Sequence, residues 1–191
     1  MTKEVVDLIM GLALLLAVSP ILLLCGVLIK LSSRGPVFYV QNRVGKDGVV
    51  FSMYKLRTMR ADAEVGTGAV WAARSDPRII PACRWMRRSH VDELPQLRNV
   101  IMGDMSLVGP RPERPEILGE LEKTYPDVSR RLAVRPGITG LAQVRNGYDT
   151  SVDNFRHKLQ GDLEYISKRR WRQEVRILMA TVFKLWDKQA N

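Results

Sequence analysis

The hydrophobic pattern of the chain begins with one long apolar stretch. Between Asp7 and Lys30 there is no charged residue, and the run reads LIMGLALLLAVSPILLLCGVLI. As a helix it is long enough to cross the hydrocarbon core of a bilayer, which is about 30 Å thick. Ser19 and Pro20 lie at its middle, where a proline loses a backbone hydrogen bond and clashes with the carbonyl of Leu16, so we expect a kink. The residues alone leave two topologies open, a spanning helix and a re-entrant helix that enters and leaves by one face.

After this stretch the polarity alternates over shorter distances. Val37–Gln41 and Val49–Leu56 alternate like strands on either side of a turn at Gly45–Gly48, which predicts a β-hairpin. Helical patterns are expected at Ile79–Arg88, Ser89–Met102 (beginning near Asp92), Glu116–Tyr125, Asp127–Leu132, Ser151–Ile166 and Arg172–Trp186. Loops are expected at 61–78 and 103–115, and a glycine-rich loop with a short strand at 135–147. The pattern indicates an α+β, predominantly helical fold, with the membrane helix at residues 1–31 and one further domain at 32–191.

The last predicted helix has two readings. It begins with the basic segment SKRRWR, which contains Trp171, and apolar residues such as Ile177 and Phe183 follow. It is either a core helix with solvated basic residues or an amphipathic helix at the membrane interface, where Trp, Lys and Arg are favoured.

The charge of the chain lies entirely outside the apolar segment. The formal net charge is +10, from 30 Lys and Arg against 20 Asp and Glu, and the charges of residues 1–30 cancel. A basic body indicates an anionic partner, either nucleic acid, an anionic membrane surface or a phosphorylated substrate. The basic residues that follow Lys30 place this body on the cytoplasmic side by the positive-inside rule. Two cysteines without a C-x-x-C motif exclude a disulfide framework and a zinc site.

Two adjacent acids open the segment HVDELPQLRNVIMGDMSLVGPRP. Asp92 and Glu93 are explained structurally as a helix cap, with Pro95 tolerated in the first turn. Chemically, one carboxylate is a competent nucleophile for phosphoryl transfer while its neighbour helps to hold a divalent cation. Neighbours on a helix point about 100° apart, so the two acids would do different jobs.

Basic residues on stiff or alternating segments accompany these acids. Prolines flank Arg111 in GPRPERP, and a guanidinium held on a rigid loop is suited to gripping phosphate in a two-pronged fashion. Arg135 precedes a proline and glycines in RPGITG, where backbone N–H groups can approach an anion. Lys55 and Arg57 share one face of a predicted strand. Each also has a plain reading as an ordinary loop or a solvated strand face. The chain has no Walker motif and no G-x-G-x-x-G.

Taken together and in order, these motifs resemble the bacterial sugar transferase family, the monotopic phosphoglycosyl transferases. The resemblance rests on the apolar helix with its Ser-Pro and on the segments PVFYVQNRVG, FSMYKLRTM, SDPRI, MRRSHVDELPQLRNVIMGDMSLVGPRP and VRPGITGLAQV. It implies transfer of a phospho-sugar from a UDP-sugar to polyprenyl (undecaprenyl) phosphate, with release of UMP. It also implies a ping-pong mechanism with a covalent aspartyl intermediate, as the first membrane step of glycoconjugate assembly.

The resemblance also implies a set of site residues. Asp92 is the expected nucleophile, and Asp92 with Glu93 is expected to hold Mg²⁺, with Mn²⁺ as the alternative. Phosphate-binding roles fall on Lys55, Arg87 and Arg111, and roles toward nucleotide or sugar fall on Arg135, Gly137, Thr139 and Gln143. The family helix is re-entrant and broken at its Ser-Pro, here Ser19 and Pro20.

The expected partners are a UDP-sugar, polyprenyl phosphate and the phospholipid bilayer, with no nucleic acid. The expected location is the cytoplasmic face of the bacterial inner membrane. The chain departs from many relatives at residues 145–149, which leaves the donor sugar undefined. Two other functions stay open, a membrane-tethered phosphohydrolase that uses Asp92 with water, and a basic adaptor for anionic lipid or nucleic acid.

Overall fold

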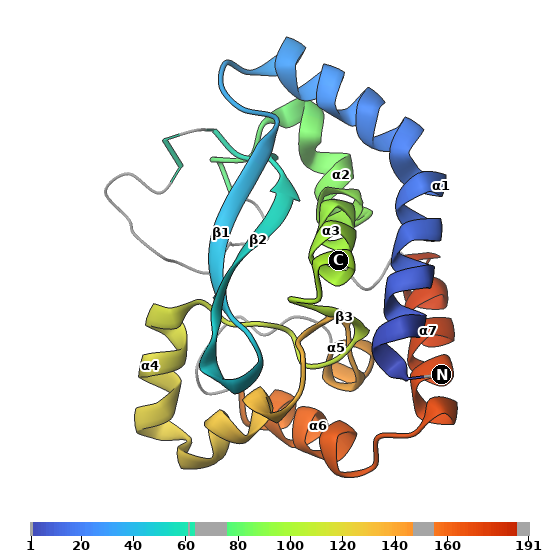
Figure 1. The fold of residues 1–191 in the computed structure, drawn as a ribbon. Coiled ribbons are helices and arrows are strands. Elements are labelled where there is room, and N and C mark those ends of the chain that lie inside the picture. Colours follow the sequence, from blue (N-terminus) through green and yellow to red (C-terminus); the bar gives the residue numbers. More distant parts are fainter. Residues whose placement is uncertain (1, 61, 64–75, 147–154, 187–191) are drawn as a thin grey trace.

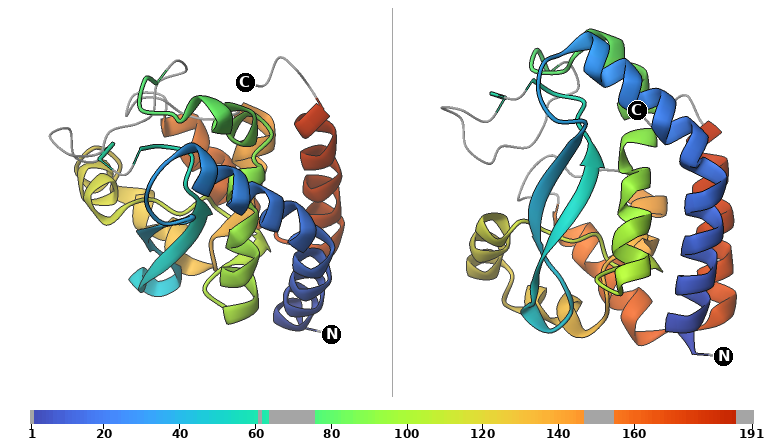
Figure 2. Two further views of the ribbon diagram at one scale, coloured as in Figure 1. Left: turned by 90° about the horizontal axis from the view of Figure 1, so that it is seen from above. Right: turned by 45° about the horizontal axis from the view of Figure 1, so that its top comes forward.

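The apolar stretch forms one long, bent helix. In the computed structural model, which describes residues 2–60, 62–63, 76–146 and 155–186, helix α1 runs from Lys3 to Ser32. It bends in its middle part (Figure 1 and Figure 2) but continues through Ser19 and Pro20. The Ser19 hydroxyl donates a hydrogen bond of 2.8 Å to the carbonyl of Leu16. Pro20 cannot donate to this carbonyl because it has no backbone N–H. The expected break is therefore a bend within a continuous helix.

Both ends of α1 pack against the rest of the molecule. Near the N-terminus, Asp7 is buried and accepts a hydrogen bond of 3.2 Å from the backbone N–H of Leu107, and Lys3 Nζ lies 2.5 Å from Glu174 Oε2. Near the C-terminus, Cys25 and Ile29 are buried in an apolar cluster with residues of the later segments. Leucines on the outer side of the helix are at least 70% exposed: Leu16, Leu23, Leu24 and Leu31. Within the described part, α1 is the one helix whose length and composition suffice to cross a membrane.

The predicted hairpin is confirmed. Strands β1 (Phe38–Val44) and β2 (Val50–Leu56) pair antiparallel, with Val44 opposite Val50 and Phe38 opposite Leu56. A 3₁₀ turn, η1 (Lys46–Gly48), joins them. Lys55 lies on the same face of β2 as the buried Phe51 and Met53, because side chains alternate along a strand. The face that carries Lys55 therefore points into the molecule and is not a solvated one.

A column of short helices runs between the hairpin and α1 (Figure 1). It consists of η2 (Pro81–Cys83), α2 (Arg84–Arg88), η3 (Val91–Gln96) and α3 (Leu97–Met102). The sequence predicted one α-helix over Ser89–Met102, and this was wrong for its first half, which is the 3₁₀ segment η3. Pro95 explains the difference, because it lacks an N–H and disfavours the α conformation at Leu94.

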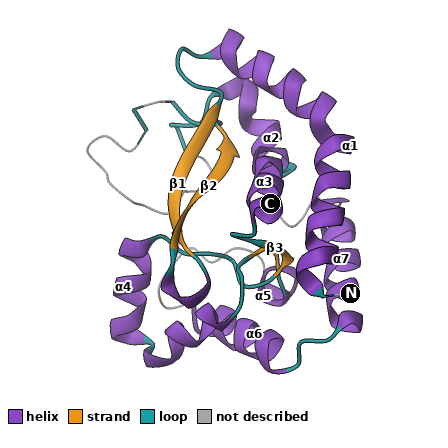
Figure 3. Ribbon diagram, viewed as in Figure 1, coloured by secondary structure: helices purple, strands orange, loops and turns teal. Residues whose placement is uncertain are grey.

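A second, parallel strand pair closes the molecule below the column. Strand β3 (Ser106–Val108) pairs with β4 (Gly137–Thr139). Strand β3 lies in a segment that was predicted to be loop. The strands approach closely at two glycines, since a Cβ on Gly137 would lie 2.1 Å from the backbone nitrogen of Gly109. Figure 3 shows how little of the fold is strand. This pair carries the chain directly into the loop that holds Arg111.

The remaining helices surround the lower half of the molecule. They are α4 (Pro115–Thr124), η4 (Pro126–Ala133), α5 (Leu141–Asn146), α6 (Phe155–Ser167) and α7 (Trp171–Trp186). Helices α4, α6 and α7 confirm predicted helical segments, and η4 does so as a 3₁₀ helix. Helix α5 was not predicted, because it lies in the segment 135–147, which was expected to be a loop with a short strand. The predicted start of α6 at 151–154 and most of the predicted loop 61–78 lie outside the described residues.

Helix α7 lies beside the N-terminal half of α1 (Figure 1 and Figure 2). It buries Ile177, yet a series of its large apolar side chains is at least 50% exposed: Trp171, Val175, Met179, Val182 and Phe183. The helix therefore has a core face and a separate exposed apolar face. This second face favours the interfacial reading of the helix.

Candidate active site

Glu93 is the centre of a cluster of opposite charges. On η3 it faces Lys55 of β2, whose Nζ donates a hydrogen bond of 2.7 Å to Oε1. Arg111 approaches from the loop after β3 and forms a two-pronged pair, with Nη1 3.0 Å from Oε2 and Nη2 2.5 Å from Oε1. The three side chains come from segments far apart in the sequence. Both oxygens of Glu93 are therefore engaged by cations.

The pKa values in this cluster follow from burial and from the neighbouring charges. Burial alone would raise the pKa of Glu93, but the charges of Arg111 and Lys55 hold it well below its usual value. Burial lowers the pKa of Lys55, and the charge of Glu93 partly offsets this effect. Glu93 is thus a fixed anion that keeps two cations in place.

Asp92 has a different environment from its neighbour. Its side chain is buried, with a residue exposure of 6%, and it makes no hydrogen bond or ion pair with another described residue. Burial, followed by the charge of Glu93, raises the pKa of Asp92 to about 6. The predicted helix cap is wrong, since the residue before η3 is His90 and no side chain caps the segment.

Three predicted phosphate-binding residues lie around the acidic pair. The charges of Lys55, Arg87 and Arg111 each act on Asp92 and lower its pKa against the effect of burial. Arg87 is half-buried in the last turn of α2, one short turn before the acids. Arg111 pairs with Glu93 in this structure, whereas the sequence analysis assigned it to substrate phosphates. The fold nevertheless brings all three cations to one place.

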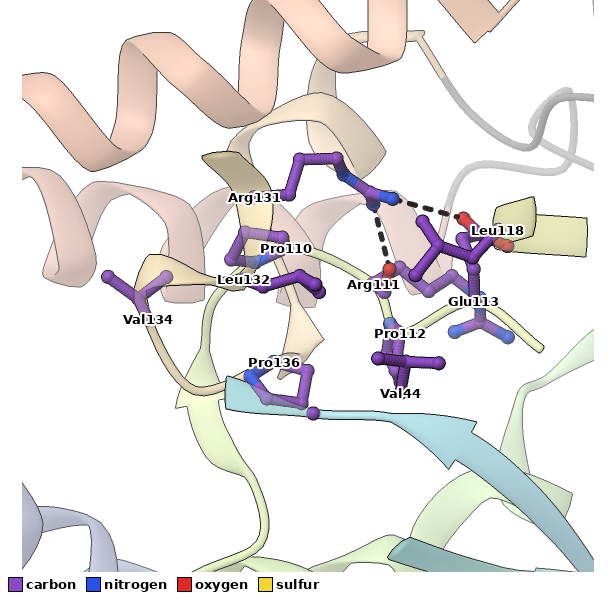
Figure 4. Close-up of a pocket in the computed structure, with 11 residues that line it drawn as sticks. Val44, Pro110, Arg111, Pro112, Glu113, Leu118, Arg131, Leu132, Val134 and Pro136 are labelled. Carbon is purple, nitrogen blue, oxygen red and sulfur yellow. Dashed lines mark hydrogen bonds and ion pairs between the residues drawn. The ribbon is translucent and has the colours of Figure 1, made fainter. Parts of the chain in front are cut away.

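The loop that carries Arg111 is held by two arginines that the sequence analysis did not single out as site residues. Arg43 of β1 donates a hydrogen bond of 2.9 Å to the carbonyl of Pro112, and Arg131 of η4 donates one of 2.8 Å to the carbonyl of Arg111 (Figure 4). Arg131 is 4% exposed. Nothing in a single sequence distinguishes a buried arginine from the many solvated ones, so neither residue had a detectable signal.

Of the four residues expected to contact nucleotide or sugar, three have partners within the protein and the fourth lines a cavity. Thr139 is buried, and its hydroxyl lies 2.7 Å from that of Thr181. Gly137 sits at the close strand approach, and its N–H donates to the carbonyl of Pro110. Gln143 donates to the carbonyl of Ile138. Arg135 lines a separate polar cavity of about 120 Å³ near the start of α1.

The departure at residues 145–149 is described only in part. Arg145 pairs with Glu164 of α6. Residues 147–149 lie outside the described part.

The donor set of the acidic pair fits a magnesium ion that arrives with its substrate. Among the described residues, no three His, Cys, Asp or Glu side chains converge into a ready-made metal site. Mg²⁺ at phosphoryl-transfer sites is commonly held by one or two carboxylates together with substrate phosphate oxygens. Asp92 and Glu93 supply that number, and Asp92 is the one whose oxygens have no hydrogen-bonded partner among the described residues.

Comparison with known proteins gives a consistent result along almost the whole chain. The family model described as "Bacterial sugar transferase" matches residues 1–188. The chain is 42% identical over 164 residues to the UDP-N-acetylgalactosamine-undecaprenyl-phosphate N-acetylgalactosaminephosphotransferase of Aeromonas hydrophila. The aligned region covers 86% of this chain and 38% of that protein.

Two further relatives match over more of their own length. The UDP-glucose:undecaprenyl-phosphate glucose-1-phosphate transferase of Caulobacter vibrioides is 39% identical over 94% of this chain and 68% of its own length. The exopolysaccharide production protein PSS of Rhizobium leguminosarum is 40% identical over 94% of this chain and 92% of its own. The region matched by this chain thus covers from little more than a third to nearly all of the length of these relatives.

Proposed function

The chain belongs to the bacterial sugar transferase family, and from this premise we propose that it transfers a phospho-sugar from a UDP-sugar to undecaprenyl phosphate or a related polyprenyl phosphate, with release of UMP. The observation that carries the proposal is the contrast between two adjacent acids. Asp92 is buried and has no hydrogen-bonded partner among the described residues, beside a Glu93 that is fixed between two cations. Names of relatives that combine a UDP-sugar with undecaprenyl phosphate support the same substrates for this chain. The reaction would be the first membrane step of polysaccharide or glycoconjugate assembly.

In the proposed mechanism Asp92 acts as the nucleophile. A carboxylate oxygen of Asp92 bonds to the β-phosphorus of the UDP-sugar while the bond from that phosphorus to the bridging oxygen breaks, and UMP leaves. An oxygen of polyprenyl phosphate then attacks the same phosphorus, and the Asp92 carboxylate departs unchanged. A carboxylate with a pKa of about 6 is mostly ionised at pH 7 and is poorly solvated, which favours attack.

The surrounding cations would offset the charge of the substrate. Lys55, Arg87 and Arg111 already act on Asp92, so a diphosphate placed against that carboxylate meets three positive groups. Positive groups fixed in advance stabilise developing phosphoryl charge because they do not reorganise during the reaction. Glu93 positions Lys55 and Arg111 for this purpose. Mg²⁺ held by Asp92 and Glu93 with the diphosphate would neutralise further phosphate charge when bound, and Mn²⁺ is the alternative ion.

We further propose that α1 is re-entrant and that the protein is monotopic, on the cytoplasmic face of the inner membrane. Its two ends both pack on the same domain, through Lys3 and Asp7 at one end and Cys25 and Ile29 at the other. A spanning helix would carry one end away from a domain that lies on one side of the membrane. The exposed leucines of α1 and the exposed apolar face of α7 would face lipid. An amphipathic helix such as α7 lies in the membrane interface with its apolar face toward the acyl chains.

The proposal is tested by product analysis with purified enzyme. A panel of UDP-sugars is incubated with Mg²⁺, with and without undecaprenyl phosphate, and UMP and lipid-linked sugar are measured. We expect UMP from at least one donor and a lipid-linked product that requires the acceptor. UMP together with free sugar phosphate, and no lipid-linked product when the acceptor is present, would identify a hydrolase instead. An Asp92→Asn variant that keeps full function would favour a basic adaptor.

A further inference from the structure

We propose that Arg131 and Asp162 form a positioning pair that fixes Arg111 through the main chain of its loop. The inference rests on the proposed function in so far as Arg111 serves substrate phosphate. Neither residue touches the acidic pair in the structure, so they act through another residue and are not catalytic themselves.

The geometry around Arg131 uses all three nitrogens of its guanidinium. Nε donates a hydrogen bond of 2.8 Å to Asp162 Oδ2 on α6, and Nη2 donates one of 2.8 Å to the carbonyl of Arg111. Nη1 lies 3.6 Å from Glu113 Oε1, and the guanidinium stacks over Phe155, 5.1 Å from the ring centre. Arg131 and Asp162 are both at least 96% buried. A planar, rigid fork suits this arrangement, and an ammonium group cannot reproduce it.

Four consecutive carbonyls of the Arg111 loop accept hydrogen bonds. The backbone N–H of Gly137 donates to Pro110 and that of Val44 donates to Glu113, whereas the two carbonyls between them, of Arg111 and Pro112, are held by the side chains of Arg131 and Arg43. A cavity of about 10 Å³, room for roughly one water molecule, is lined by the loop together with Val44 and Val134 (Figure 4). Because Pro110 and Pro112 restrict the backbone on either side, fixing the carbonyl of Arg111 also fixes the direction of its side chain.

The buried charges of this network are balanced. Asp162 and Glu113 compensate Arg131, and Lys158 Nζ donates a hydrogen bond of 2.6 Å to Glu113. Buried ion pairs can often be replaced by apolar residues without loss of stability. A displacement of about 1 Å in a substrate-binding group can, in contrast, cost about 100-fold in rate.

A double-mutant cycle tests whether Arg131 acts through Arg111. Steady-state UMP release is measured for Arg131→Met in the wild-type and in an Arg111→Ala background. We expect kcat/KM to fall by about 10- to 100-fold in the first and by less than about 2-fold in the second, since a residue that acts through Arg111 loses its effect when Arg111 is gone. Equal losses in both backgrounds would overturn the proposal.

Three further variants separate positioning from folding. Arg130→Met makes the same change at the exposed neighbour, which forms a surface ion pair of 3.5 Å with Asp127, and is expected to behave like wild type. Arg131→Lys keeps the charge and replaces the methionine variant in the cycle if that variant does not fold. Its loss of kcat/KM is likewise expected to depend on the presence of Arg111. Asp162→Asn keeps the shape of the side chain that pairs with Arg131, and is expected to lower kcat/KM by less than Arg131→Met does.

Hydrogen–deuterium exchange separates this inference from the proposed function. In the bilayer-reconstituted protein, Arg131→Met should speed exchange in the segment 107–114 and leave the hairpin unchanged. If the wild-type protein releases no UMP from any donor, the proposed function fails while the exchange result still decides the inference. Unchanged exchange in that segment would contradict the positioning role.

Discussion

At the scale of single residues, the pKa values of two adjacent carboxylates are shifted in opposite directions. Glu93 is surrounded by Arg111 and Lys55, which favour its charge, whereas Asp92 is buried without a hydrogen-bonded partner among the described residues. The sequence pointed to both acids because they are adjacent and precede a proline. It could not assign their environments, because the partners of Glu93 lie 38 and 18 residues away. The division of roles therefore follows from the fold.

The first prediction concerns stability at mildly alkaline pH. Because the pKa of Asp92 is about 6 in the folded protein and near 3.8 when unperturbed, its charge opposes folding above both values, by up to about 3 kcal/mol. Asp92→Asn should therefore raise the free energy of unfolding at pH 8, and the gain should shrink as the pH falls from 6 toward 4. Thermal unfolding in one detergent across this pH range is the measurement.

Glu93→Gln is the matched control, and its effect has the opposite sign. Removing this anion leaves Lys55 and Arg111 buried without a charged partner, which should cost about 3 kcal/mol. Equal changes in melting temperature for the two variants would show that their environments do not differ.

The second prediction concerns the pH dependence of catalysis. Only ionised Asp92 can attack phosphorus, so kcat/KM should be constant above pH about 6 and fall tenfold per pH unit below it. The charge of Glu93 contributes to the raised pKa of Asp92, so in Glu93→Gln the fall should begin at a lower pH. A profile of UMP release between pH 4.5 and 8.5 tests this, and an acid limb that stays at the same pH in the variant would count against the account.

At the scale of elements, local patterns predicted what local interactions determine. The hairpin was predictable because alternation and turn residues are contiguous in the sequence, and α1 was predictable from its length. The 3₁₀ character of η3 depends on Pro95, a residue that the first turn of an α-helix also tolerates, so its presence did not reveal the difference. Strand β3 has three residues and pairs with a strand about 30 residues later, so it left no period to detect.

The third prediction tests the close approach of β3 and β4. Gly137→Ala would place a Cβ 2.1 Å from a backbone atom of Gly109, which no side-chain adjustment can relieve. We expect a loss of several kcal/mol and reduced activity, because β3, the strand paired with Gly137, leads directly into the Arg111 loop. Gly119→Ala on α4 is the control, since an added Cβ there meets nothing within 4 Å and alanine should stabilise the helix by up to about 1 kcal/mol. Similar melting temperatures for the two variants would contradict this description of the strand pair.

At the scale of the whole molecule, the helix expected to enter the membrane is also part of the domain's framework. Its N-terminal end joins β3 and α7, and its C-terminal end joins the cluster beside the hairpin. Arg57, the residue after β2, adds to the second attachment by donating hydrogen bonds to the carbonyls of Ser33 and Arg34, just after the helix. The sequence indicated the kink but not these attachments, because they join residues up to 171 positions apart. With the proposed re-entrant topology, these attachments would hold the site at the level of the lipid headgroups.

The fourth prediction concerns the topology of α1. Both native cysteines are buried, so single cysteines placed at Thr2 and at Ser32, both exposed, can be labelled selectively. In inverted membrane vesicles, a membrane-impermeant maleimide should label both positions, and in right-side-out spheroplasts it should label neither. Labelling of the two positions from opposite sides would establish a spanning helix.

The central claim is that Asp92 carries the phospho-sugar during transfer. Intact-protein mass spectrometry after incubation with UDP-sugar and Mg²⁺, without polyprenyl phosphate, measures this most directly. The account predicts that wild-type protein gains the mass of one phospho-sugar, that the adduct disappears when polyprenyl phosphate is added, and that Asp92→Asn gains nothing. Wild-type protein that stays unmodified while UMP forms only when both substrates are present would contradict it, and would indicate direct transfer between the two substrates.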